Sequence, residues 1–303
     1  MVWKNLLKSQ SFTIFLLLLI ATLVGYYFTR PQNQRPEEVR PLDMISGLVM
    51  VVVGFSAGLL GGIIGTGGCS LMLPVIHFWM NYPAPIAVGT TLFAVIFTAV
   101  SGGYGHLIRK NLDVRATLWL GGIGVLGVLL GSWIFLFLTT QTKLLGLILG
   151  IVFLWPALRM IKEGIFRGKI PTISDSRIPG TRLGLSLFGF IVGVTMGIAG
   201  LGGGYALVPG LIYLFHAPVY VTMGTSLAVM IPLALVGGLI KLLQGFVDIG
   251  AGLLLALGTI IGAQVGAAII KRFKPATLKL IFGVYFLYVS LKFITGYFGI
   301  TIW

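Results

Sequence analysis

The sequence predicts an all-α, polytopic membrane protein with two inverted-topology helical repeats, each containing a Gly-broken helical hairpin, plus an extra N-terminal transmembrane helix. Three observations predict this fold class: an apolar composition, long uncharged stretches and an internal repeat. Of the 303 residues, 57% are hydrophobic and 9% are charged, and the mean hydropathy is +1.04. Soluble domains carry about a quarter charged residues, so lipid is expected to be the main solvent of this chain.

Long uncharged stretches indicate several membrane spans. Residues without Asp, Glu, Lys or Arg run over Met44–Ile108, Leu183–Ile240 and Ile249–Ile270. About twenty apolar residues are enough to cross a bilayer. Because lipid cannot hydrogen-bond to an open backbone, these stretches must be helical.

The net charge of +14 does not indicate a nucleic-acid partner. The basic residues lie in short breaks between apolar runs, as the positive-inside rule requires of a membrane protein. Cys69 is the single cysteine, which excludes a disulfide framework and a cysteine-based metal site. The lipid bilayer is therefore the expected partner of the apolar surface of this chain.

The N-terminus predicts an additional helix. Lys4 and Lys8 precede an apolar run over Phe12–Phe28, which resembles the start of a signal peptide. No small-x-small cleavage site follows, so we expect an uncleaved transmembrane helix. Residues 1–43 form this first region, in which a polar linker, Arg30–Asp43, leads to the main body.

An internal repeat appears at a constant offset without gaps. Gly54 corresponds to Gly189, an offset of 135 residues (189 − 54). Because glycine is abundant in this chain, matches at other residue types carry more weight. Such matches in the same register are Pro74 with Pro209, Pro83 with Pro218, Thr90 with Thr225, and Asp113 with Asp248. Duplication of one unit explains them.

The repeat divides the chain into 44–160 as repeat 1, 161–182 as a cytoplasmic loop and 183–303 as repeat 2. Each repeat contains a helix, a Gly-rich break, a shorter helix and three spans. The helices expected in the first repeat are Met44–Ile64, Cys69–Met80, Ile86–Ile108, Ala116–Leu138 and Lys143–Met160. Those expected in the second are Leu183–Ala199, Tyr205–Phe215, Val219–Leu243, Ile249–Ile270 and Ala276–Phe293.

Loop charges predict opposite membrane orientations for the two repeats. Arg109, Lys110 and Arg115 follow the third helix of repeat 1, whereas Gln244, Gly245 and Gly250 lie at the equivalent place in repeat 2. At the next turn the bias in positive charge reverses, because the basic residues there, lysines and an arginine, belong to repeat 2. Equivalent loops therefore lie on opposite sides of the membrane. An inverted repeat needs an odd number of crossings, so each Gly-rich break becomes the tip of a hairpin.

The acidic residues exclude several kinds of chemistry. All seven lie in loops or at helix ends: Glu37, Glu38, Asp43, Asp113, Glu163, Asp175 and Asp248. No span therefore contains a carboxylate that could serve general acid–base catalysis or a proton relay. The three histidines lack the spacing of metal ligands. We expect no enzyme, no cofactor and no bound metal.

The Gly-rich breaks are the main candidate site, because each interrupts an apolar run and opens a short helix. Their freed N–H groups and helix dipoles would face a buried cavity and attract an anion, an arrangement found in transporters. The alternative is close helix packing through small residues, which explains Gly54, Gly58, Gly127 and Gly131. The candidate residues are Thr66, Gly67, Gly68, Cys69, Ser70, Gly202, Gly203, Gly204 and Tyr205.

Further polar residues extend the candidate site. Thr90, Thr91, Thr225 and Ser226 begin equivalent spans; their hydroxyls either donate to a ligand or bond to helix carbonyls. Gln264 lies inside a span, where it needs a partner or a ligand.

His106 and Lys241 share one repeat position and are candidates for gating or coupling. For Lys241 the alternative is snorkelling to the membrane interface.

The sequence resembles the sulfite exporter TauE/SafE family of the toluene-sulfonate uptake permease superfamily. The resemblance rests on the two Gly-rich breaks with Pro74 and Pro209, on the two Gly-Thr pairs, and on the stretch Gly262–Gly266. It covers the chain from about Met44 to the C-terminus. This chain departs from the family in having Cys69 in place of a glycine and in its N-terminal helix.

The resemblance implies a secondary carrier in the bacterial inner membrane. Its substrate would be a small organic or inorganic anion, expected to contain sulfur, such as sulfite or a sulfonate. A coupling proton is left open as a second partner. The alternatives are an anion channel, a carrier for a non-sulfur solute, and a membrane scaffold that transports nothing.

Overall fold

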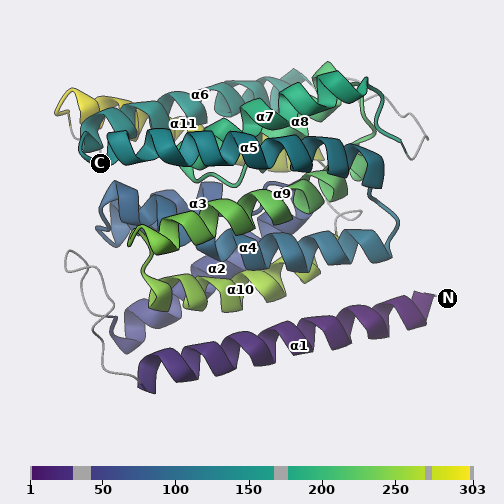
Figure 1. Ribbon diagram of the computed structural model, residues 1–303, viewed down its shortest axis with the longest axis horizontal. Helices are drawn as coiled ribbons and strands as arrows, with labels where there is room; N and C mark the ends of the chain where they lie inside the picture. The colour runs from purple at the N-terminus through teal and green to yellow at the C-terminus, as the bar shows by residue number, and fades with distance from the viewer. Residues whose placement is uncertain (1, 30–41, 167–176, 270–274, 301–303) are drawn as a thin grey trace.

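The computed structural model describes residues 2–29, 42–166, 177–269 and 275–300, and every regular element within them is a helix (Figure 1). In chain order the elements are α1 (Val2–Thr29), α2 (Met44–Ile64), α3 (Cys69–Pro74), the π-helical turn η1 (Val75–Trp79), α4 (Ala84–Ile108), α5 (Val114–Thr139), α6 (Thr142–Phe166), α7 (Arg182–Ala199), α8 (Gly204–Leu214), α9 (Val219–Leu243), α10 (Ile249–Ile269) and α11 (Pro275–Tyr297). The all-α fold class is therefore confirmed.

The predicted helices agree closely with the observed ones. The ranges predicted for α2 and α9 coincide with the observed ranges, and α6 extends to Phe166 rather than Met160. The helix expected over Cys69–Met80 is divided into α3 and η1. Pro74 lacks a backbone donor at this point, but the equivalent Pro209 leaves α8 regular. Proline alone thus does not impose the π turn.

Three predicted features lie outside the described residues. They are most of the linker Arg30–Asp43, the middle of the loop 161–182, and the basic stretch at 270–274.

Seven of the described helices are long and apolar enough to cross a membrane. They are α2, α4, α5, α6, α7, α9 and α10. The half-helices that follow the breaks, Cys69–Trp79 and Gly204–Leu214, are shorter, as is the apolar part of α1, Ser11–Gly25. The chain is a multi-pass membrane protein.

The two repeats are interlocked. Helix α2 of the first repeat packs against α10 of the second, and α7 of the second packs against α5 of the first. Helices α4 and α9 form a central pair, and α6 packs against α11. In Figure 1 the layer with α5, α6, α7 and α11 lies above the layer with α2, α4, α9 and α10. Each large interface therefore joins one repeat to the other.

Glycines at equivalent positions hold these interfaces close. A Cβ on Gly58 would lie 2.6 Å from the Cα of Thr259, and one on Gly189 would lie 2.8 Å from the Cα of Leu120. Gly131 meets the backbone of Val194 on the neighbouring helix in the same way. Small residues allow such approach between membrane helices. Their predicted packing role is confirmed.

Equivalent helices of the two repeats run antiparallel. A Cβ on Gly102, late in α4, would be 3.0 Å from Leu227, early in α9; one on Gly237, late in α9, would be 3.0 Å from Leu92. The α6–α11 pair behaves alike, with Gly150 beside Ile294. Antiparallel contacts between equivalent helices are consistent with the predicted inversion of one repeat relative to the other. The opposite membrane orientation of the repeats remains a prediction.

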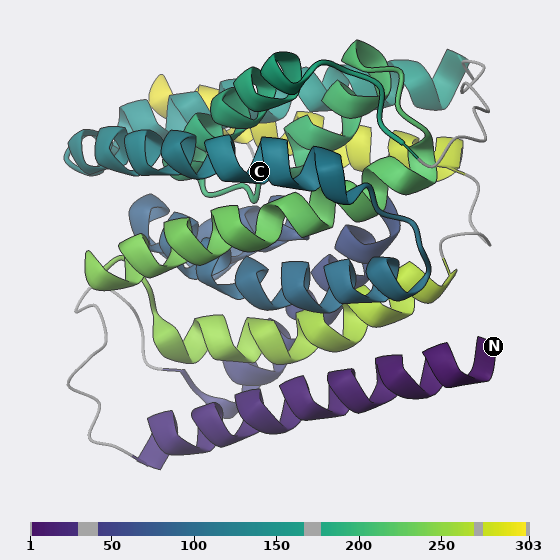
Figure 2. The same ribbon diagram turned by 45° about the vertical axis from the view of Figure 1, so that its right-hand side comes forward.

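Helix α1 lies along the outer side of α10 (Figure 2). Leu16 and Ile20 are buried against α10, whereas Phe15 and Leu18 on the other side are 61% and 64% exposed. One apolar face thus meets protein and the other is left for lipid. That α1 spans the membrane remains a prediction.

Candidate functional site

Both Gly-rich breaks are tight turns built from left-handed glycines. Gly65 ends α2 with a φ of 83°, and Gly68 precedes α3 with a φ of 80°. Gly200 and Gly203 repeat the pattern with φ values of 64° and 72°. Side chains disfavour this region, which glycine enters freely. After the first break the chain returns along α2, since Gly68 meets the backbone of Ala57.

The two breaks contact each other at the centre of the molecule. A Cβ on Gly204 would lie 2.5 Å from the Cα of Thr66, and one on Gly202 would overlap the sulfur of Cys69. The structure thus brings the first break together with the second, as expected for residues of one site. Ser70 and Tyr205 are also buried here, at 4% and 6% exposure.

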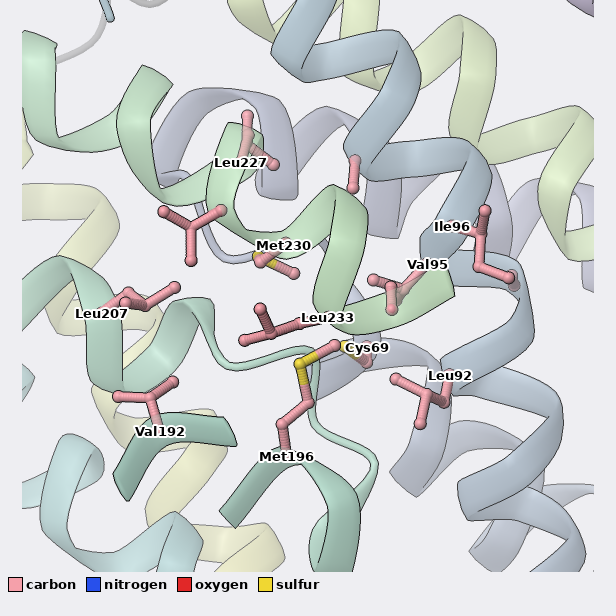
Figure 3. Packing of buried hydrophobic residues seen from close by; sticks show 14 of the residues in the cluster. Cys69, Leu92, Val95, Ile96, Val192, Met196, Leu207, Leu227, Met230 and Leu233 are labelled. Atoms are coloured by element: carbon pink, nitrogen blue, oxygen red, sulfur yellow. The ribbon is translucent and has the colours of Figure 1, made fainter. Parts of the chain in front are cut away.

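Apolar side chains fill the place where the breaks meet. A Cβ on Gly202 would lie 2.8 Å from the methyl group of Met230 and 3.4 Å from Val95. In Figure 3 the sulfur-containing side chains of Cys69, Met196 and Met230 gather here from α3, α7 and α9. The surroundings of the breaks are therefore less polar than the sequence suggested.

Thr90 and Thr225 make reciprocal hydrogen bonds between the repeats. The backbone N–H of Asp248 donates to the hydroxyl of Thr90, and that of Asp113 donates to the hydroxyl of Thr225, each over 3.0 Å. Each aspartate also caps its own following helix, at Ala251 and at residue 116 respectively. Each hydroxyl thus accepts a hydrogen bond from the other repeat. The two predicted roles, donation to a ligand and bonding to a helix carbonyl, do not include this contact.

Thr91 and Ser226 are equivalent in sequence but not in contacts. The Thr91 hydroxyl donates to Ala87 of its own helix over 2.7 Å, which is the back-bonding alternative. The Ser226 hydroxyl instead donates to the carbonyl of Gly65 over 2.8 Å. Ser226 therefore joins the central helix α9 directly to the first break.

Gln264 has a protein partner. Its amide nitrogen donates to the carbonyl of Ser101 over 2.6 Å, and the Ser101 hydroxyl donates to Ile260 over 3.0 Å. These bonds join α10 to α4. The position of Gln264 inside a span predicts the need for such a partner, and the Ser101 carbonyl provides it.

His106 and Lys241 are both fully buried. The Nε2 of His106 lies 3.3 Å from the carbonyl oxygen of Gly62. The ammonium group of Lys241 lies 3.2 Å from the centre of the Phe135 ring. No hydrogen bond to this ammonium group forms within the described part of the chain. The snorkelling alternative for Lys241 is wrong, because the side chain is enclosed by protein.

A cavity beside the first break contains residues that the sequence did not single out. It has a volume of about 50 Å³ and reaches from Thr66 and Tyr205 to Arg159 on α6 and Phe286 on α11. The guanidinium of Arg159 lies 3.5 Å from the centre of the Tyr213 ring. Its contact with α8 depends on the fold and has no local sequence pattern.

Seven described helices long and apolar enough to cross a membrane, packed around two Gly-rich breaks that meet, define a polytopic α-helical membrane protein. The sequence profile described as sulfite exporter TauE/SafE matches residues 49–293. The chain belongs to the sulfite exporter TauE/SafE family, which confirms the resemblance.

Curated relatives agree with this membership. The chain is 29% identical to a probable membrane transporter protein of Bacillus subtilis, YdhB, over 77% of this chain and 94% of the relative. It is also 29% identical to a probable membrane transporter protein of Methanocaldococcus jannaschii, over 77% of this chain and 89% of the relative. A TauE/SafE family protein of Arabidopsis thaliana is 31% identical over 39% of this chain and 23% of its own length. No solved structure matches the chain.

Proposed function

We propose that this protein is a secondary transporter of a small anion, organic or inorganic and containing sulfur, such as sulfite or a sulfonate. It would carry the anion across the bacterial inner membrane by alternating access. The family's printed description supports a sulfur oxyanion, and the names of the relatives support membrane transport.

The contact between the two breaks is the observation that carries the proposal. Non-helical backbone at membrane depth is tolerated where it is buried in protein or lines a cavity, and transporters typically bind substrate at such interruptions between repeats. Thr66 and Gly204 meet at this interface. Ser226 extends the contact to the central helix pair.

The antiparallel central pair supports alternating access. Helices α4 and α9 each have, in their second turn, a threonine bonded to the other repeat, Thr90 to Asp248 and Thr225 to Asp113. These contacts are 158 and 112 residues apart in sequence. A two-fold arrangement gives two related states in which one end is closed and the other open.

Counterflow in proteoliposomes tests the transport mechanism. Vesicles loaded with unlabelled sulfite or an alkanesulfonate should accumulate the labelled anion transiently against its gradient, because a carrier exchanges substrate through one alternating site. Vesicles without protein provide the control. Uptake that never exceeds equilibrium and does not saturate would indicate a channel, and absent uptake of every anion would reject transport.

A further inference from the structure

The cavity beside the first break has an apolar wall and a charged rim. Its apolar lining comes from the second half-helix and its neighbours: Ile64, Met160, Val208, Pro209, Ile212 and Phe286. A water molecule needs roughly 10–15 Å³ of such space, so about 50 Å³ suits a few waters or one small organic group. The walls favour the organic group, since water would find few hydrogen-bond partners there.

Arg159 supplies the charge at the rim. Its guanidinium stacks at 3.5 Å on Tyr213 and lies 5.5 Å from Trp155. Aromatic rings hold a guanidinium in place by cation–π attraction. With five donors in a planar fork, a guanidinium binds carboxylate and sulfonate oxygens while it keeps other contacts.

Tyr205 lines the cavity, but its hydroxyl is buried beside Thr195, which lies outside the lining. The Tyr205 side chain is 6% exposed, and its hydroxyl makes no hydrogen bond within the described residues. The hydroxyl of Thr195, which lies near enough to influence it, donates instead to Ile191 and Val192. The recognition of an anion in this cavity therefore does not depend on the Tyr205 hydroxyl.

Aromatic rings pack together at the equivalent place in the first repeat. The positions equivalent to Ile212 and Tyr213 are His77 and Phe78 (212 − 135 and 213 − 135). Both rings pack on Phe293, at centroid distances of 5.3 and 4.6 Å. Lys292 covers Phe78 at 4.8 Å as Arg159 covers Tyr213. The two ends thus share a cation over an aromatic ring, but the Arg159 end contains the cavity.

We propose that this cavity binds an organic anion with a compact apolar body, and that Arg159 recognises its carboxylate or sulfonate group. Val208, Ile212 and Phe286 then contact the apolar body. A bare inorganic oxyanion fits less well, because most of its oxygens would lose water against apolar walls. This inference rests on the proposed transport function and adds the substrate class and a specificity-determining residue.

Calorimetric binding to the full chain in lipid nanodiscs tests the inference. The probes are sulfite, methanesulfonate, ethanesulfonate and propanesulfonate. The affinity of the wild-type protein should rise about fourfold per methylene, as expected from the burial of each group, and sulfite should bind more weakly than propanesulfonate. Arg159→Gln should weaken binding of every sulfonate by at least about tenfold, whereas Arg159→Lys should retain part of the affinity.

Matched variants separate the cavity from general effects. Arg182→Gln removes a guanidinium that lies 5.6 Å from Trp119, outside the cavity lining, and should bind like wild type. Val208→Phe should fill the cavity and remove the preference for longer chains. Equal affinity for sulfite and propanesulfonate, or wild-type binding by Arg159→Gln, would overturn the proposal.

Counterflow on the same preparation separates this inference from the proposed function. Counterflow of sulfite without any chain-length preference overturns the cavity proposal and leaves the transporter. Sulfonate binding that Arg159→Gln weakens, with a chain-length preference that Val208→Phe removes but without counterflow of any sulfonate, supports the binding site and rejects transport.

Discussion

Gly202 is restricted in two ways at the contact between the breaks. Its φ of 74° belongs to the left-handed region, and a Cβ would overlap the sulfur of Cys69. Both restrictions follow from the contact with the other repeat. Gly122 on α5 provides a contrast, because its φ is ordinary and no atom lies within 4 Å of the place of its Cβ.

Gly202→Ala should therefore lower the thermal stability of the purified protein. Left-handed strain costs about 1–2 kcal/mol and overpacking about 1–3 kcal/mol, so we expect a melting temperature lower by about 5 °C or more. Gly122→Ala should leave it nearly unchanged. Equal melting temperatures for the two variants, measured by size exclusion after heating, would show that the breaks are not in close contact.

Lys241 is buried without an anionic or hydrogen-bonding partner for its ammonium group among the described residues. Its contact with Phe135 at 3.2 Å compensates only part of the lost hydration, because a cation–π contact contributes about 2 kcal/mol when desolvated. Retaining such a residue is costly for stability. A role in attracting or gating the anion would account for it.

Lys241→Met should keep or raise the melting temperature, because methionine fills similar space without a polar group. The rate of counterflow of sulfite or an alkanesulfonate should fall by at least about tenfold, which corresponds to about 1.4 kcal/mol of activation free energy. Phe135→Leu is the companion variant, and it should change transport less because the cation remains. Full transport by Lys241→Met would remove Lys241 from the candidate site.

Helix pairs, rather than single residues, explain the threonines. Thr90 joins the start of α4 to the start of α10, and Thr225 joins α9 to α5. The partner of each hydroxyl is the backbone of an aspartate on the other repeat. These contacts explain the two hydroxyls without a bound substrate.

Thr90→Val and Thr225→Val should each destabilise the protein by about 1–3 kcal/mol, because a buried N–H loses its acceptor. The serine variants should restore most of the stability. Thr139→Val is the control, since the Thr139 hydroxyl donates only to Leu136 of its own helix at an exposed position. Thermal melting measures the difference, and unchanged stability in both valine variants would contradict the cross-repeat contact.

At the scale of elements, sequence predicted most of the helices and little of their contacts. Bilayer thickness and the lack of water impose helix length and type, so the ranges of α2 and α9 could be read directly. The position of each break followed from its glycines. Partners such as Thr90 with Asp248, or Arg159 with Tyr213, join distant segments and have no local pattern.

The orientation of the whole molecule can be tested at two equivalent exposed turns. Lys110 and Gly245 are 135 positions apart (245 − 110), and both have positive φ, 57° and 81°. The loop charges predict that Lys110 faces the cytoplasm and Gly245 the other side.

Cysteine substitution at each turn should separate them. An impermeant maleimide added to intact cells should label Gly245→Cys but not Lys110→Cys, and both should react after permeabilisation. The native Cys69 is buried, so the unsubstituted protein provides the background. Labelling of both variants in intact cells would reject the opposite orientations.

The pairing of α2 with α10 also imposes an order on biosynthesis. Helix α2 ends at Ile64 and α10 begins at Ile249, so 184 residues (249 − 64 − 1) are made between them. During that time the glycine face of α2 has no permanent neighbour and is exposed to lipid or to a chaperone. If the orientations are opposite, a gene for a single repeat could form this structure only if its product inserted into the membrane in both orientations. Fusion of two copies in one chain fixes the ratio of the two orientations at one to one.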